Sequence, residues 1–207
     1  MSLILRKSHT LILLVSAFII GALLYAGFKD KNYEIPLLET GLPVGFVSYA
    51  NPAFGFSVAY PESFSINEGH VYNAFGPGKE IYGVSFTIPK SFSSGTNLSS
   101  DTYVSVETLP GINGCRASAF LDRAESSSTV SENDFEYDVA EARGAAAGNI
   151  YEEIIYAIPN SKPCMAIRYF IHSTNIRNYD PGTVKEFNQD KLLGLFDQIR
   201  RTYKGVE

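Results

Sequence analysis

The chain has 207 residues, and its 17 basic and 22 acidic side chains give a formal net charge of −5. All the acidic residues follow position 28, whereas Arg6 and Lys7 precede it, so the part after position 28 carries seven more negative than positive side chains. This balance argues against a nucleic-acid partner and against docking on anionic lipid. With 14 Phe, 13 Tyr and no Trp, the composition favours strands joined by polar turns.

The first feature along the chain is an uncharged apolar run at residues 11–28. As a helix it would reach about 27 Å, close to the ~30 Å hydrocarbon core of a membrane. We therefore expect a single transmembrane helix there, with residues 1–10 in the cytoplasm because Arg6 and Lys7 favour the inside. A cleaved secretory signal is the alternative, but neither Ala22 nor Ala26 has a small residue two positions before it.

Residues 29–45 mix charges, prolines and glycines and are typical of a linker. Residues 46–207 are then enough for one extracytoplasmic domain with its own hydrophobic core. These boundaries place the protein in the cell membrane as a single-pass chain, attached through its N-terminal helix.

Alternating apolar residues predict strands in the first half of this domain. They lie at residues 54–60, 81–88 and 102–109. Residues 115–123 follow an Asn-Gly turn and are the best candidate for a short helix. The serine-rich residues 125–134 are expected to form a polar loop.

Three further strands are predicted in the second half, at residues 135–142, 150–158 and 165–172, in a consecutive antiparallel arrangement. A C-terminal helix is indicated by a capping-box spacing at Thr183 and Glu186. Its apolar stripe recurs every three or four residues: Leu192, Leu195, Phe196, Ile199 and Tyr203. The fold class predicted is thus α+β, an antiparallel β-sheet packed by helices that include the C-terminal one.

Both ends of the domain resemble a known family. Residues 49–64 contain a glycine-aromatic strand that runs into Tyr60-Pro61 and then Phe64, and residues 195–203 look like a family-specific last helix. These segments resemble PsbP-like domains, although Phe64 stands where a Trp is usual and Tyr203 where a Phe is usual. The resemblance implies the Mog1/PsbP-like fold, whose members are largely non-enzymatic accessory and binding proteins.

Cys115 and Cys164 are the only cysteines. In an extracytoplasmic domain an even pair is expected to form a disulfide; two buried thiols or a catalytic thiolate are the alternatives. The sequence around Cys115 superficially resembles an L,D-transpeptidase motif but lacks the preceding Ser-His. A sortase-like site would use Cys164, Arg168 and either His70 or His172, but the Thr-Leu-x-Thr residues that precede the cysteine in that family are absent.

An acidic alternation suggests a cation site: Glu132, Asp134, Glu136 and Asp138 would project from one face of an extended chain. A solvated strand face explains the same pattern, and the glycine and closing Glu of an EF-hand are absent. Two isolated histidines do not make a zinc site. We therefore predict no catalytic, cofactor-binding or metal-binding residues.

Other surface residues have weaker signals. Exposed tyrosines could serve recognition, namely Tyr72, Tyr103, Tyr151 or Tyr179. Asn97-Leu98-Ser99 is a glycosylation sequon, without consequence in a bacterial protein.

Together these observations predict a membrane-anchored extracytoplasmic accessory or binding module without catalytic activity, whose partner is a protein or envelope ligand. A cysteine-dependent envelope transpeptidase is the alternative.

Overall fold

The computed structural model describes residues 42–132 and 135–205. The predicted membrane anchor at residues 11–28, and all but the last four residues of the predicted linker, lie outside these ranges. No helix within them combines the length and apolarity that a membrane crossing requires.

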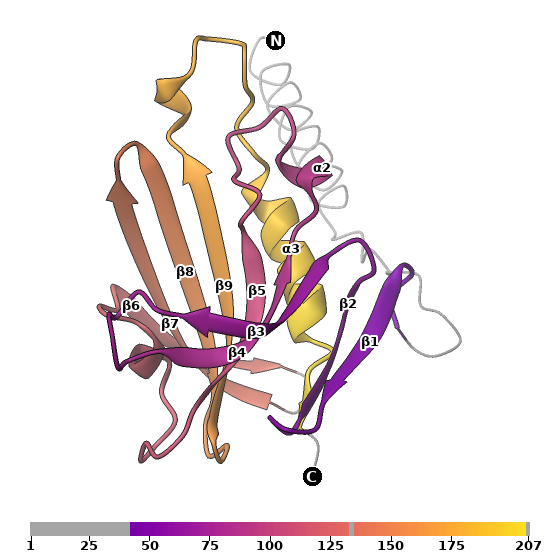
Figure 1. The fold of residues 1–207 in the computed structure, drawn as a ribbon, viewed down its shortest axis with the longest axis vertical. Helices are drawn as coiled ribbons and strands as arrows, with labels where there is room; N and C mark the ends of the chain where they lie inside the picture. Colours follow the sequence, from indigo (N-terminus) through magenta and orange to yellow (C-terminus); the bar gives the residue numbers. More distant parts are fainter. Residues whose placement is uncertain (1–41, 133–134, 206–207) are drawn as a thin grey trace, which may run out of the picture. The chain divides into compact units, whose positions relative to one another are not determined.

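The described strands form two antiparallel sheets (Figure 1). The smaller sheet contains, in spatial order, β1 (Phe46–Asn51), β2 (Phe56–Pro61) and β10 (Lys204–Gly205). The larger sheet contains, in spatial order, β3 (Ser65–Tyr72), β4 (Ile81–Thr87), β5 (Tyr103–Leu109), β9 (Cys164–Thr174), β8 (Asn149–Ile158), β7 (Phe135–Ala146) and β6 (Ser126–Glu132). The helices are α2 (Lys90–Ser93), α3 (Gln189–Arg200) and two 3₁₀ helices, η1 (Ala117–Phe120) and η2 (Ile176–Asn178).

One face of the seven-stranded sheet forms the main core. Successive side chains of a strand point to opposite faces, so the alternating apolar residues of β4, β5, β7 and β9 gather on one side. The smaller sheet and α3 cover this face. The Phe196 ring of α3 packs edge-on against the Tyr169 ring of β9, with ring centroids 5.3 Å apart. Leu192, Phe196 and Ile199 of α3 are at most 2 % exposed.

The opposite face forms a second core because the sheet curls over it. β3 is one of the two edge strands, yet Tyr72 on β3 reaches β8, where its hydroxyl donates to Glu153 at 3.0 Å. Figure 1 shows the β3–β4 hairpin crossing the direction of β8 and β9. Gly83 on β4 permits a close approach of β4 to β5, because a Cβ there would lie 2.9 Å from the Cα of Glu107. η1 and the Cys115–Cys164 disulfide close the rest of this core.

The predicted α+β class is wrong. Ten strands dominate the described residues, which contain only two α-helices, and a second sheet covers much of the main core. The helix expected at residues 115–123 is reduced to η1, and α3 begins after Asn188 rather than at the Thr183 capping box. The Asn188 side chain accepts a hydrogen bond from the Lys191 N–H, so this residue is the N-cap.

The six predicted strands are present with shifted ends, but four others, β1, β3, β6 and β10, were not foreseen. Residues 125–134 were expected to be a loop, yet β6 forms there by pairing with β7 over its whole length. β1 and β3 were also missed, and a register shift between Asn67 and His70 breaks the alternation of β3. The consecutive antiparallel arrangement predicted for the three strands of the second half is confirmed, because β7 pairs with β8 and β8 with β9. β9 also pairs with β5, which joins the two halves of the sheet.

Candidate functional site

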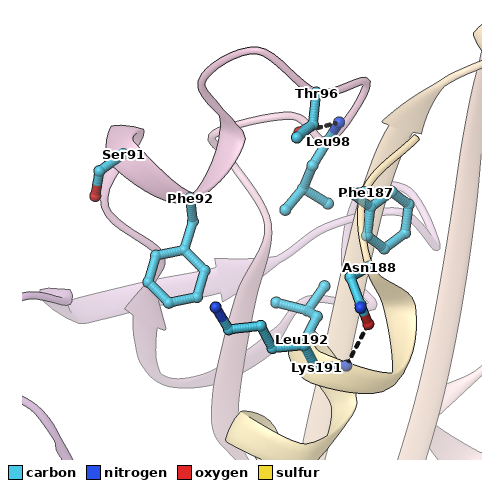
Figure 2. A pocket seen from close by; sticks show the side chains of 8 residues that line it. All are labelled: Ser91, Phe92, Thr96, Leu98, Phe187, Asn188, Lys191 and Leu192. Carbon is cyan, nitrogen blue, oxygen red and sulfur yellow. Dashed lines mark hydrogen bonds between the residues drawn. The ribbon is translucent and has the colours of Figure 1, made fainter. Parts of the chain in front are cut away.

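An apolar pocket lies between α2 and the start of α3 (Figure 2). Its volume is about 320 Å³, at the lower end of the range for small-molecule sites. Four segments line it: α2, the loop after it, the approach to α3 and the first turn of α3. The lining residues are Ser91, Phe92, Thr96, Leu98, Phe187, Asn188, Lys191 and Leu192.

The inner part of the pocket is apolar and continuous with the main core. Leu98 and Leu192 are 6 % and 2 % exposed and belong to that core, whereas Phe92 and Phe187 are half-buried at its margin. The Phe92 ring is held edge-on against Phe64, with ring centroids 6.1 Å apart. The pocket therefore has an anchored apolar lining rather than loose surface side chains.

Asn97 holds two walls of the pocket together. Its amide nitrogen donates to the Thr174 carbonyl at 2.8 Å, and its amide oxygen accepts from the Phe187 N–H at 2.9 Å. Its backbone N–H donates to the Lys185 carbonyl. Because Asn97 is 5 % exposed and both side-chain polar atoms are bonded, it fixes Leu98 relative to Phe187.

The rim carries the polar groups. Figure 2 shows the Lys191 side chain crossing the space beside Leu192, with its amino group toward the Phe92 ring. Lys191 is exposed, and it sits in the first turn of α3, where the helix dipole also favours negative charge. This arrangement suits a ligand with an apolar body and an anionic end.

Sequence reasoning did not find this pocket. Leu192 was assigned only to the core-facing stripe, and Asn188 was not recognised as a cap. The pocket is formed by segments about 90 positions apart that Asn97 joins, and no local pattern encodes that contact.

A cluster of charged groups lies on the opposite face of the seven-stranded sheet. Arg168 of β9 is fully buried and donates from Nε and Nη2 to the Glu107 carboxylate at 2.8 to 3.1 Å. Its Nη1 pairs with Glu153, and its Nη2 also donates to the Phe120 carbonyl at 2.8 Å. The Tyr72 ring lies over the guanidinium at 3.6 Å.

The pKa values in this cluster follow from burial and pairing. Burial raises the pKa of Glu107, but the Arg168 charge and the hydrogen bonds from His70, Arg168 and Ser105 oppose it and lower that pKa to about 2. Burial raises the pKa of Tyr72 well above its usual value, with Glu153 adding to the effect. Since Arg168 and Glu107 are satisfied by protein groups, the cluster fixes β3, β5, β8, β9 and η1 together.

The predicted disulfide is confirmed: Cys115 and Cys164 are bonded, with Cα atoms 5.1 Å apart. Neither sulfur is then available as a thiolate. The residues considered as partners of a catalytic cysteine make other contacts. Arg168 and His70 both contact the Glu107 carboxylate, and His172 Nδ1 lies 2.8 Å from the Asp101 carboxylate. The structure does not assemble a cysteine-histidine-arginine site.

The acidic alternation does not lie on one strand. Glu132 is the last residue of β6, whereas Glu136 and Asp138 lie on β7, which pairs with β6 in antiparallel register. Glu132 pairs with Arg200 and Arg201, and Asp138 accepts the Ala117 N–H at 2.7 Å. Asp134 lies outside the described residues, and within them no three His, Cys, Asp or Glu side chains are grouped as metal ligands would be.

The tyrosines proposed for recognition differ in exposure. Tyr72 is buried over Arg168, and Tyr103 and Tyr151 are half-buried in ring contacts with Phe170. Tyr179 is 37 % exposed. Of the four, only Tyr179 presents a large exposed surface.

Comparisons with known proteins give distant structural similarity only. No family model matches the sequence, and no curated protein matches it. A crystal structure from Bacteroides thetaiotaomicron VPI-5482 aligns with a TM-score of 0.45 and 13% identity, covering 77% of this chain and 48% of that one. The present chain thus spans about half of that protein. The solution structure of cyanobacterial PsbP (CyanoP) from Synechocystis sp. PCC 6803 aligns with a TM-score of 0.44 and 14% identity, covering 82% of this chain and 97% of that one. At these TM-scores the similarity carries no argument about function.

Proposed function

We propose that the described domain is a binding module that takes the apolar part of a small anionic amphiphile into the pocket between α2 and α3. The observation that carries the proposal is the combination of an apolar lining continuous with the core and a lysine at the rim. An apolar group gains free energy on leaving water for such a lining, and Lys191 favours an adjacent anion.

The pocket size limits the ligand. A volume of 320 Å³ corresponds to roughly ten water molecules at about 30 Å³ each. This is enough for a medium-length acyl chain or one aromatic ring. A medium-chain carboxylate such as octanoate therefore represents the ligand class.

The two polar clefts near β6 and β7 do not fit this ligand. Arg116 and Asp138 line both of them, and hydroxyls and carboxylates supply most of the other polar groups. Binding of an acyl chain there would leave those groups without water or a partner, which costs free energy.

We also propose that residues 11–28 tether this module to a membrane, with the domain on the extracytoplasmic side. The support is the uncharged run and the basic pair before it. Protease treatment of intact cells tests the orientation, because the domain should be degraded without lysis. Survival until lysis, with a control surface protein degraded, would contradict it.

The pocket is tested with a diazirine-bearing octanoate and the full chain in lipid nanodiscs, followed by mass spectrometry of the labelled peptides. We expect labelling at residues 91–98 and 187–192, competition by octanoate and none by octylamine. Leu98→Trp should block labelling by filling the pocket. Lys191→Glu should weaken it about fivefold, because an attractive charge worth about 0.3–1 kcal/mol is replaced by a repulsive one.

Lys79→Glu is the matched control, since Lys79 is exposed in a turn away from the pocket lining. Labelling that maps elsewhere, or equal competition by octylamine, would contradict the proposal.

A further inference from the structure

The two edges of the seven-stranded sheet differ in how they are protected. A free edge presents unpaired N–H and C=O groups that can pair with another chain, and natural proteins usually protect it with bulges, lysines or prolines. At one edge, β3 has a register shift between Asn67 and His70, with Glu68 within it. This shift breaks the continuous ladder that a new strand would need.

The other edge, β6, has none of these features. Its sequence Ser-Ser-Ser-Thr-Val-Ser-Glu contains no lysine, arginine or proline, and its register with β7 runs without a shift from Ser126 to Glu132. Among the described residues, β7 supplies all the backbone partners of β6. The serines of β6 and Thr129 are exposed.

The sequence of β6 is complementary to itself in one antiparallel register. A two-fold axis through Thr129 pairs all seven residues and brings Thr129 opposite its own copy, a pairing that stabilises sheets. Ser127 then lies opposite Ser131, and Ser128 opposite Val130. A register centred on a neighbouring residue would leave part of β6 without a partner strand.

Charge does not oppose this register. Glu132 is the one charged residue of β6, and it would lie opposite Ser126 rather than another carboxylate. Its charge is already balanced, since Arg200 and Arg201 approach it at 2.7 and 2.6 Å. Like charges directly across a strand pair, which would disfavour it, are therefore absent.

We propose that β6 pairs with β6 of a second copy of this chain, in antiparallel register about Thr129, and joins the two seven-stranded sheets. The contact is isologous, as two-fold interfaces are. A single strand pair buries less than the ~1,200 Å² of total surface typical of stable interfaces, so the association is weak and depends on concentration.

Cysteine cross-linking tests the register in the full chain. The native cysteines are bonded to each other, so an engineered cysteine is the one free thiol. Thr129→Cys should form an intermolecular disulfide under mild oxidation, because directly opposed Cβ atoms lie about 4.5–5.5 Å apart.

Two controls distinguish this register from any other dimer. Ser127→Cys and Ser131→Cys should each fail to cross-link alone, because like positions are then four residues, or about 13 Å, apart. A mixture of these two variants should cross-link. A dimer held elsewhere would not give this pattern.

Sedimentation gives a second measurement. Thr129→Lys places two like charges opposite each other and should shift the chain to monomer, whereas Ser65→Lys on the exposed edge strand β3 should not. Equal cross-linking by Thr129→Cys and Ser127→Cys would overturn the proposal. So would capture of a different protein by Thr129→Cys, or a failure of the mixed variants to link.

Discussion

On one face of the seven-stranded sheet, apolar side chains pack against α3 and the smaller sheet, whereas on the other a guanidinium and two carboxylates are enclosed with a disulfide. The main core depends on the total apolar area removed from water, which many combinations of side chains can supply. The second core depends on each charged partner, because a buried charge that loses its partner costs several kcal/mol. The two faces should therefore respond differently to single substitutions.

The largest effect is expected from a charge placed in the main core. Ile199 is fully buried on α3, so Ile199→Asp should lower the free energy of unfolding by about 5 kcal/mol. The measurement is urea unfolding followed by circular dichroism. Arg201→Asp is the control, since the Arg201 side chain is 46% exposed and should cost less than about 1 kcal/mol. Similar values would show that α3 does not close the main core.

A smaller loss should follow when the second core loses its cation. Arg168→Met keeps an apolar chain of similar length but leaves Glu107 buried without its partner, which should cost about 4 kcal/mol. Adding Glu107→Gln in that background should recover part of the loss. Arg143→Met is the control, because Arg143 is 62% exposed beside Glu152. If the double variant is no more stable than Arg168→Met, the unpaired charge of buried Glu107 is not the cause of the lost stability.

Acid should also distinguish the two cores. The folded pKa of Glu107 is lowered from 4.5 to about 2, so its pairing stabilises the fold above its unfolded pKa and is lost as the pH falls from about 4.5 toward 2. The loss is on the order of 3 kcal/mol, at about 1.4 kcal/mol per unit. The free energy of unfolding, measured between pH 7 and pH 2.5, should depend less on pH in Glu107→Gln than in the unsubstituted protein. The same dependence on pH in both proteins would exclude Glu107 as the titrating group.

The smallest expected effect concerns the close approach of β4 and β5. Gly83→Ala should cost about 2 kcal/mol, because the new Cβ meets the backbone of Val106 and Glu107. Gly144→Ala on β7 is the matched control, since a Cβ there meets nothing within 4 Å. Equal thermal unfolding midpoints for the two variants would show that the sheet relaxes without disturbing the charge cluster.

Local patterns predicted the parts of the fold that obey a single period. The stripe of Leu192, Phe196 and Ile199 is buried as expected, because its spacing follows the helix turn and one side must leave water. β6 was missed because a serine-rich segment predicts a loop. It forms a strand because it pairs with β7. The fold class was wrong for the same reason, since strand pairing decided the state of segments with weak local preference.

The sites show the same limit. The disulfide could be predicted because the chain offers one pair of cysteines. Arg168 was noticed, but as a catalytic group, because its partner Glu107 is 61 positions away and belongs to another strand. The pocket between α2 and α3 likewise depends on long-range hydrogen bonds from Asn97, which sequence spacing does not reveal.

The burial of Asn97 also has a consequence for how the chain is produced. Asn97 carries the acceptor amide of the Asn97-Leu98-Ser99 sequon, and in the folded domain that nitrogen is bonded to the Thr174 carbonyl. A glycan attached there in a eukaryotic secretory host would replace this bond and would not fit beside Phe187. Sugar on Asn97 would therefore mark molecules modified before this loop had docked, so that the glycosylated fraction records the order of modification and folding.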